Sequence, residues 1–492
     1  MEGAPAALTR QLSKGEQQLA ELQQTDNSHD YNWSNDPRNP HLWTKRRKVA
    51  MIVLVSCIGY VCTMGSTIYA PGREQVAVEF SVSAEASILP VSLFNIGMGL
   101  GPLIASPLSE TFGRRIVYLV VLPLFGLFVL GWGFSSSLAS LVICRFFAGV
   151  FASPSVAIAA ATIADMLPPS QRAFPLIVYY TTPTLGALSG PLIGGFVISQ
   201  KSWHWTAWVT LIFAVPVSLP LLFTRESYKK VLLARRNVPA VDVDSQSRQE
   251  SPSKPPATSQ LRLFITQNLG RPAVMLLTEP ICSFLCLYMS FQFGLLYLFV
   301  VSSPRIYATT YGFDIQAQSL SFLGLLIGCA SAPLLLIYIE LRLYRPRLAR
   351  SPEERLPPEE RLDGAMVGSV LLPIGLFMFA FTARPSIPFY VPMVAQGIVM
   401  FGSLSVYIPA GMYLMETYGA KYGASASGAN SLLRYALAST FPLFAPTMFA
   451  RLGTAGATSV LGGFMVVMAC IPWVLRKWGP ELRRRSKYRV DD

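Results

Sequence analysis

Long apolar runs, each of roughly 18 residues or more, recur along the whole chain of 492 residues. Runs of this length are typical of helices that cross a lipid bilayer, because about 20 helical residues span its hydrocarbon core. Only 14% of the residues are charged, against about 25% in soluble proteins. The sequence therefore predicts a single all-α polytopic membrane protein surrounded by the lipid bilayer, rather than several soluble domains.

The apolar runs predict twelve spans, at 48–70, 87–109, 116–134, 138–164, 173–198, 206–224, 272–300, 317–339, 364–383, 387–414, 424–449 and 456–476. A polar segment separates the sixth span from the seventh. Two halves of six spans are the organisation of transporters built from parallel repeats, so we expect two pseudo-symmetric six-helix bundles. The expected parts are a disordered cytoplasmic N-terminus (1–47), an N-terminal bundle (48–224), a cytoplasmic linker (225–271), a C-terminal bundle (272–476) and a cytoplasmic tail (477–492).

The basic residues predict the orientation of these spans. The chain has 40 Lys and Arg residues, and two of them, Arg145 and Arg434, lie within predicted spans. The positive-inside rule places both termini in the cytoplasm, because this choice leaves few basic residues outside. The outer loops then hold only Arg73, Lys201, Arg305, Arg384 and Arg451. We expect the cell membrane as the location, with the vacuolar membrane as the alternative.

The residues that carry most cofactor and metal chemistry are absent from the predicted spans or isolated within them. All seven cysteines lie in apolar runs, and all three histidines lie outside the spans. We therefore expect neither a disulfide framework nor a metal site, and no cofactor. The basic residues that give the net charge of +13 lie mainly in the segments between the apolar runs, and the sequence contains no nucleic-acid motif. A membrane-embedded enzyme is disfavoured because no nucleophile, base and metal set converges.

The stretch "GPLIASPLSETFGRRIVYLV" (101–120) places charges between two apolar runs. One interpretation is a tight turn, in which Gly113 permits unusual backbone angles and the arginines stay on the inner side. The other is a cytoplasmic gate. In that case Glu110 faces the N-terminus of another helix, and Arg114 or Arg115 pairs with Asp165. Such a latch would form when the cytoplasmic side is shut and break when it opens.

Several motifs together resemble a known family. They are "SPLSETFGRR" (106–115), "NDPRNPHLW" (35–43), "RFFAG" (145–149), "GALSGPLIGG" (186–195) and "WHWTAW" (203–208). The chain resembles the major facilitator superfamily over nearly its whole length, in the form of fungal twelve-span drug:proton antiporters. Glu110 stands where many relatives have aspartate, and His204 replaces the usual arginine.

The resemblance assigns roles to two of these motifs. It links Arg145, in the fourth span, to proton coupling. It identifies the fifth span as an antiporter signature, made by Gly186, Gly190, Pro191, Gly194 and Gly195. Physically, glycines four residues apart leave one helix face as bare backbone for close packing, and Pro191 permits a bend.

Other polar residues in the spans are functional candidates, because intramembrane charges are costly. Glu279, predicted two turns inside the seventh span, is a second proton-coupling candidate. The alternative is a residue at the start of a helix, beside Pro280. The candidates for a substrate cavity are Tyr60, Thr63, Tyr180, Gln292, Gln396, Asn430 and Arg434.

These features predict a proton-coupled secondary active transporter. It would act as a monomer and export a small organic compound, such as a drug, toxin or secondary metabolite, by alternating access. Proton-coupled uptake of a small organic solute is the alternative, followed by a membrane receptor on the same fold. The scarcity of acids in the spans favours neutral or weakly charged aromatic compounds over polycations.

Overall fold

The computed structural model describes residues 33, 36–168, 171–234, 270–351 and 356–488. The described residues are mostly helical, as expected for an all-α membrane protein. The predicted disorder of residues 1–47 falls mostly outside the described residues, but residues 40–42 and 45–47 are helical, which contradicts the prediction there. Most of the predicted linker also falls outside the described residues.

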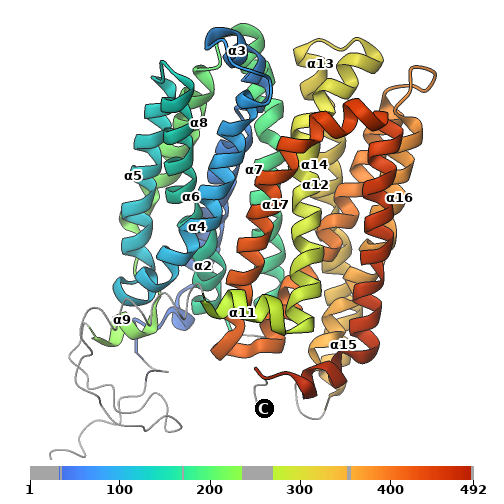
Figure 1. The fold of residues 1–492 in the computed structure, drawn as a ribbon. Helices are drawn as coiled ribbons and strands as arrows, with labels where there is room; N and C mark the ends of the chain where they lie inside the picture. Colours follow the sequence, from blue (N-terminus) through green and yellow to red (C-terminus); the bar gives the residue numbers. More distant parts are fainter. Residues whose placement is uncertain (1–32, 34–35, 169–170, 235–269, 352–355, 489–492) are drawn as a thin grey trace, which may run out of the picture.

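The first half of the chain forms one bundle of helices (Figure 1). Its elements are η2 (Pro40–Leu42), α2 (Lys45–Thr67), η3 (Ala70–Gly72), α3 (Arg73–Glu79), η4 (Ala86–Ile88), α4 (Leu89–Phe112), α5 (Arg114–Gly133), α6 (Leu138–Met166), α7 (Ala173–Gln200), α8 (Trp205–Ser218), η6 (Leu219–Phe223) and α9 (Lys229–Ala234).

The second half forms the other bundle, coloured yellow to red in Figure 1. Its elements are α11 (Arg271–Thr278), α12 (Pro280–Tyr311), α13 (Ile315–Leu320), α14 (Phe322–Ile339), η8 (Glu340–Tyr344), α15 (Arg345–Arg350), η9 (Pro358–Leu362), α16 (Asp363–Thr382) and α17 (Tyr390–Arg485). The long α17 is interrupted where Gly419 and Gly453 adopt positive φ angles of 56° and 68°, so it contains three membrane-crossing pieces.

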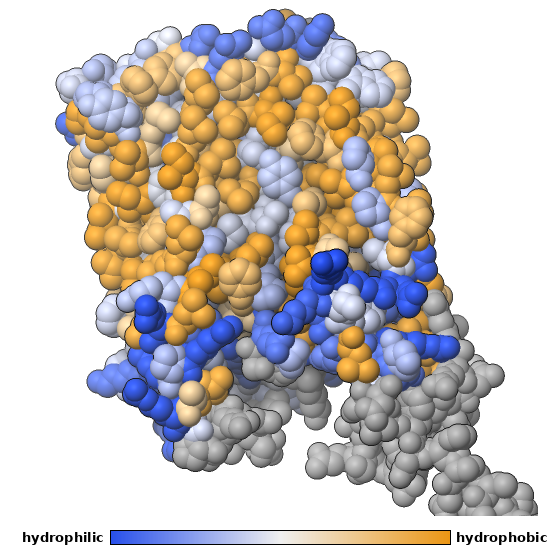
Figure 2. All heavy atoms as spheres, turned by 180° about the vertical axis from the view of Figure 1, so that it is seen from behind, coloured by the Kyte–Doolittle hydropathy of each residue, from blue (hydrophilic) through white to orange (hydrophobic). Residues whose placement is uncertain are grey.

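Ten segments of the described chain are long and apolar enough to cross a membrane. The α7 helix is not among them, because Pro, Gly, Ser and Thr reduce its hydropathy. The last of the ten, Tyr422–Arg485, covers two predicted spans that meet at Gly453. When α7 is added and this segment is divided, the helices equal the twelve predicted spans in number, although the seventh lies at Pro280–Tyr311 rather than at 272–300. Figure 2 shows the corresponding hydrophobic belt between two hydrophilic ends.

The two ends of the molecule differ in the elements that they carry. We call the end with α9, α11, α15 and the end of α17 the terminal side, and the end with α3 and α13 the opposite side (Figure 1). The bundles meet where α4 packs against α17 and where α7 packs against α13 and α14. The interface between the halves thus runs along helices of both bundles.

Glycines set how closely α7 approaches its neighbours. A Cβ atom on Gly186, Gly190 or Gly194 would overlap atoms of α2 or of the residue just after it: Tyr60 O, Thr67 Oγ1 or Ile68 O. On Gly195 it would overlap Ser319 Oγ of α13, in the other half. On both sides, therefore, α7 packs so closely against its neighbours that these positions have no room for a Cβ atom.

This contact predicts the effect of adding a side chain to α7. We expect Gly190→Leu to lower the Tm of the purified protein, because the overlap with α2 costs about 1–3 kcal/mol or more. Gly463→Leu is the control, since no atom lies within 4 Å of a Cβ added there. Thermal unfolding in detergent tests this, and equal Tm values for the two variants would contradict the packing argument.

Candidate functional site

A cavity of about 510 Å³ lies between the two halves. Its walls come from α2, α4, α6 and α7 on one side and from α12 and α17 on the other. It extends to the terminal side, where Glu110, Arg114, Arg271 and Met415 line its mouth. The cavity is therefore accessible from that side.

The halves contact each other on the opposite side. Ser66 Oγ of α2 lies 2.8 Å from Tyr297 OH of α12, at hydrogen-bonding distance. Gln316 Nε2 of α13 donates to Ser199 Oγ of α7 over 3.0 Å. Together with the contact between Gly195 and Ser319, these bonds close the route from the cavity to the opposite side.

Four of the seven predicted cavity residues line this cavity: Thr63, Tyr180, Asn430 and Arg434. Tyr60 is not among the lining residues, and its hydroxyl lies 2.6 Å from Ser189 Oγ of α7. This pair joins two helices of the first half.

The two buried amides also hold helices together and do not line the cavity. Gln292 Oε1 accepts a hydrogen bond from Ser403 Oγ at 3.3 Å. Gln396 Nε2 donates to Ser303 Oγ at 2.8 Å, and its Oε1 accepts from Tyr307 OH at 3.3 Å. A buried amide needs hydrogen-bond partners, and neighbouring helices provide them for Gln396, whereas Gln292 Nε2 is buried without one. Neither amide lines this cavity, and their role in a substrate cavity stays a prediction.

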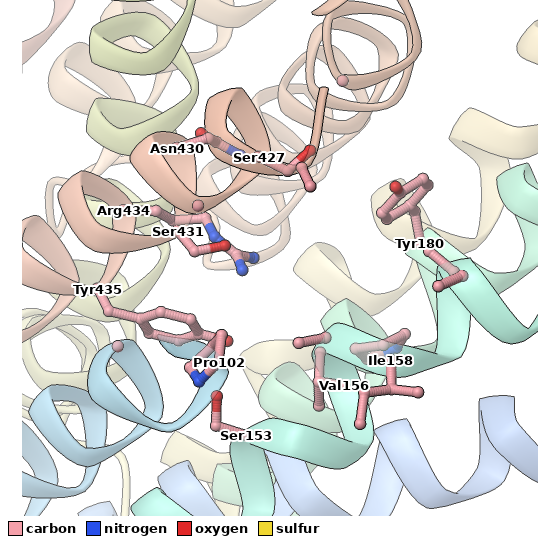
Figure 3. A pocket seen from close by; sticks show the side chains of 18 of the residues that line it. Pro102, Ser153, Val156, Ile158, Tyr180, Ser427, Asn430, Ser431, Arg434 and Tyr435 are labelled. Carbon is pink, nitrogen blue, oxygen red and sulfur yellow. The ribbon is translucent and has the colours of Figure 1, made fainter. Parts of the chain in front are cut away.

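Arg434 projects from α17 into the cavity (Figure 3). One of its terminal nitrogens donates to Tyr407 OH over 3.0 Å. Its guanidinium carbon lies 4.7 Å from the ring centre of Phe293 and 4.5 Å from that of Tyr435. Within the described residues, Glu110 is the one acid that lines the cavity, and it lies at the mouth.

Arg145 lies outside the cavity and is fully buried. Its Nε donates to Pro90 O over 3.0 Å, and a terminal nitrogen donates to Ser66 O over 2.7 Å. The guanidinium also lies over the rings of Tyr69 and Trp132. Arg145 thus fixes the end of α2 beside the contact between Ser66 and Tyr297, and its role in proton coupling stays a prediction.

Glu279 does not lie inside a span. The α11 helix ends at Thr278 and α12 begins at Pro280, so Glu279 occupies the extended break between them. Proline disfavours helical angles in the residue before it, which explains the break. The buried carboxylate accepts hydrogen bonds from Ser486 Oγ at 2.6 Å and Lys487 N at 3.1 Å. The predicted position two turns inside the span was therefore wrong, and the alternative, a residue at the start of a helix beside Pro280, is confirmed. Glu279 holds the C-terminal segment.

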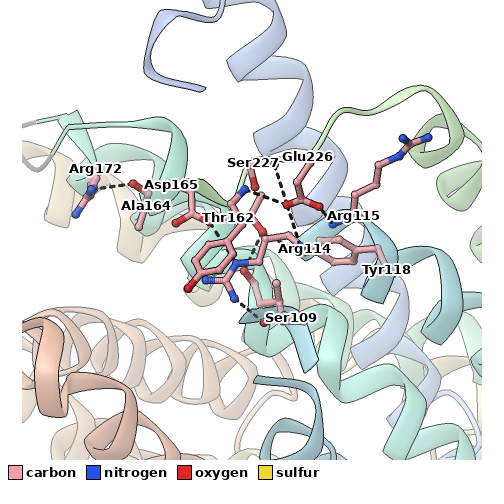
Figure 4. Close-up of polar contacts among 12 residues, drawn as sticks. Ser109, Arg114, Arg115, Tyr118, Thr162, Ala164, Asp165, Arg172, Glu226 and Ser227 are labelled. Carbon is pink, nitrogen blue, oxygen red and sulfur yellow. Dashed lines mark hydrogen bonds and ion pairs between the residues drawn. The ribbon is translucent and has the colours of Figure 1, made fainter. Parts of the chain in front are cut away.

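The predicted gate residues gather around the turn between α4 and α5 (Figure 4). Arg114 Nε lies 3.2 Å from Asp165 Oδ2, as the sequence led us to expect. Gly113 has a φ of +100°, which favours glycine. Arg115 donates to Leu222 O at 2.9 Å, and Glu110 is exposed at the cavity mouth.

The expectation that this ion pair breaks when its side opens was wrong. The pair between Arg114 and Asp165 is present while the cavity opens to the same side. The physical reason is that α5 and α6 belong to the same bundle, so a movement of one half against the other leaves their distance unchanged. The pair therefore stiffens one half.

Glu226, which the sequence analysis did not single out, binds the start of α5. Its Oε1 accepts from Arg114 N at 2.9 Å and its Oε2 from Arg115 N at 3.1 Å. Oε1 also accepts from the backbone of Ser227 and Tyr228. A carboxylate at a helix N-terminus satisfies backbone groups that have no partner in the helix and complements the helix dipole. The signal in the sequence was an acid directly after the sixth span.

The second half has a larger network of charges on the terminal side. Arg361 donates to Glu340 Oε2 at 2.8 Å and to Glu416 Oε1 at 2.9 Å. Further ion pairs involve Arg347 with Glu360 and Asp363, Arg476 with Glu360, and Arg483 with Glu359. The sequence analysis missed this network because the partners are far apart in the chain.

The contacts of Glu226 predict a loss of stability on neutralisation. We expect Glu226→Gln to destabilise the protein by about 1–3 kcal/mol, because the amide cannot accept as many of the four backbone hydrogen bonds. Thermal unfolding in detergent measures this. The exposed Glu85→Gln serves as the control, and an unchanged Tm in both variants would contradict the role of Glu226.

Comparisons with known proteins agree with this architecture. The model of the Major Facilitator Superfamily matches residues 55–442. The ascochitine biosynthesis cluster MFS transporter of Didymella fabae is 32% identical over 93% of this chain and 88% of its own length. Fluconazole resistance protein 1 of Saccharomyces cerevisiae is 31% identical over 93% of this chain and 84% of its own.

A solved structure shares the fold. The proton:xylose symporter XylE bound to 6-bromo-6-deoxy-D-glucose aligns with a TM-score of 0.64 at 16% identity, over 88% of this chain and 96% of that one. The family model, the relatives and the two-bundle fold lead to one conclusion: the chain is a membrane transporter, not an enzyme, and belongs to the major facilitator superfamily.

Proposed function

We propose that this protein exports a small organic compound, such as a drug, toxin or secondary metabolite, in exchange for protons by alternating access. The observation that carries the proposal is the central cavity, which lies between the halves and reaches the terminal side alone. A site between two repeats is where such transporters bind their substrates. Relatives named for fluconazole resistance and for a biosynthesis cluster favour export.

The distribution of basic residues supports a cytoplasmic terminal side. The start of α2 reads "KRRK" and the end of α17 reads "RRR". Basic residues in short loops and at span ends remain in the cytoplasm. The cavity of the monomeric transporter would then take up its cargo from the cytoplasm. We propose the cell membrane as its location, with the vacuolar membrane as the alternative.

The conformational change would break contacts between the halves on the opposite side and form new ones on the terminal side. Opening of the opposite side breaks the bonds of Ser66 with Tyr297 and of Gln316 with Ser199. Closing of the terminal side brings Glu110 of α4 toward Arg271 of α11, because these residues line the mouth from different halves. Gly113, Arg114, Arg115 and Asp165 keep the turn that carries Glu110 rigid.

The proton would bind near the mouth of the cavity. Glu110 is the one carboxylate among the described lining residues, so we propose it as the proton acceptor in place of Glu279. Protonation removes its charge and with it the attraction to Arg271, which would bias the gate. Arg145 contributes by holding the end of α2 beside the contact that opens on the opposite side.

The proposal predicts transport driven by a pH gradient in inside-out membrane vesicles. With an acidic lumen, we expect vesicles that contain the transporter to accumulate fluorescent aromatic dyes from a panel, above vesicles without it. Glu110→Gln should abolish the gradient-driven accumulation and retain dye exchange without a gradient. Loss of lumenal dye under the same gradient would instead support proton-coupled uptake. Dye accumulation that does not depend on the pH gradient would contradict proton coupling.

Alternating access predicts that a side chain at Gly195 opens the opposite side. We expect Gly195→Leu to raise several-fold the labelling of a Ser66→Cys variant by a membrane-impermeant maleimide in intact cells, because the added side chain overlaps Ser319. Gly463→Leu is the matched control, and the same protein without Ser66→Cys gives the background. Unchanged labelling would contradict the assignment of this contact as the closed gate.

A further inference from the structure

The charges that line the cavity are unequally compensated. At the mouth, the positive charge of Arg114 is balanced by Asp165 at 3.2 Å, and Arg271 shares the mouth with Glu110. Deeper in, Arg434 has no ion pair with any described residue. Its Nε is buried without a hydrogen-bond partner. The depth of the cavity thus carries a net positive charge.

Arg434 cannot relieve this charge by losing a proton, because a guanidinium stays protonated in proteins. Burial of an unpaired charge is costly. The rings of Phe293 and Tyr435 offset part of the cost through cation–π contacts. The two rings do not neutralise the guanidinium. A cargo with negatively charged oxygens would balance its charge.

The walls around Arg434 have two characters (Figure 3). Asn430 lies one helical turn before Arg434 on α17, lines the same cavity, and also has a buried side-chain oxygen without a partner. The facing wall of α6 presents the apolar side chains of Val156 and Ile158. Tyr180 and Tyr407 make an edge-to-face pair with centres 6.1 Å apart, one from each half. The cationic group therefore lies on the wall of the second half, and aromatic and apolar side chains from both halves surround it.

We propose that the cargo is an amphipathic organic anion, an aromatic compound with a carboxylate that Arg434 binds. Arginine binds carboxylates through parallel hydrogen bonds, and the terminal N–H groups of Arg434, which project into the cavity, can donate them. The apolar ring system lies against Val156, Ile158 and the tyrosines, and Asn430 binds a polar substituent near the carboxylate. This inference rests on the proposed transport function and specifies its substrate class.

The same arrangement disfavours a cationic cargo. An ammonium group in the depth of the cavity would meet the like charge of Arg434, and no described lining residue there offers a carboxylate. A neutral aromatic compound can accept a hydrogen bond through a carbonyl oxygen, but it leaves the charge of Arg434 unbalanced. Charge is therefore the property by which the site discriminates.

Three probes of the same shape test this: 1-naphthoate, its neutral amide and 1-naphthylmethylammonium. Their binding to the purified full-length protein in detergent is measured by calorimetry. We expect naphthoate to bind at least tenfold more tightly than the amide, and the ammonium compound to bind most weakly. Arg434→Gln should remove the preference for naphthoate, and Arg434→Lys should keep part of it. Arg384→Gln is the control, since it removes the charge of an exposed arginine that does not line the cavity.

The outcomes separate this inference from the proposed function. Equal binding of the three probes, a preference for the ammonium compound, or a naphthoate preference that survives Arg434→Gln would overturn the anion site. If Arg434→Gln lowers the Tm too far for use, the order of the three probes on the wild type still decides. Preferred binding of naphthoate without gradient-driven transport would support the site and contradict proton-coupled export. Gradient-driven transport of the amide but not of naphthoate would support proton-coupled export and contradict the anion site.

Discussion

Contact between helix backbones is the constraint on which the structure depends. Inside a bilayer, apolar side chains gain little by leaving lipid for protein, so helices associate where small residues allow close packing. In the first half, added Cβ atoms on Gly97 of α4 and Gly149 of α6 would overlap the backbone of the other helix. In the second half, Gly324 and Gly328 make the same kind of contact from α14 to the first span of α17. Corresponding helices of the two repeats thus pack by the same device.

The sequence predicted the features that have a local cause. Span lengths follow from hydropathy, the turn at Gly113 from glycine's tolerance of positive φ, and the pair of Arg114 with Asp165 from the cost of leaving charges unpaired near lipid. Glu279 was misplaced because Pro280 breaks the helix within a run that is apolar on both sides. Glu226 and the network around Arg361 were missed because their partners come from distant parts of the chain, which periodicity does not reveal.

The cavity candidates show the same limit. Thr63, Tyr180, Asn430 and Arg434 line the cavity, whereas Gln292 and Gln396 bond to neighbouring helices. Residue type and span position were similar for both groups. What separates them is the face of the helix on which each side chain lies, and in spans that are apolar on nearly all sides the hydrophobic pattern does not specify that face. Side-chain orientation became known only with the packing.

The two intramembrane arginines differ in their surroundings. Carbonyl oxygens and aromatic rings surround the fully buried Arg145, although one of its terminal nitrogens has no partner. Arg434 lines the cavity, and its Nε–H has no partner. A permanent charge beside a water-accessible cavity also responds to the membrane voltage, by up to about 2.3 kcal/mol per elementary charge for 100 mV. An interior that is electrically negative would draw the empty transporter toward the state in which Arg434 faces it. With the cytoplasmic terminal side proposed above, a negative resting potential would favour the unloaded state in which the cavity opens to that side.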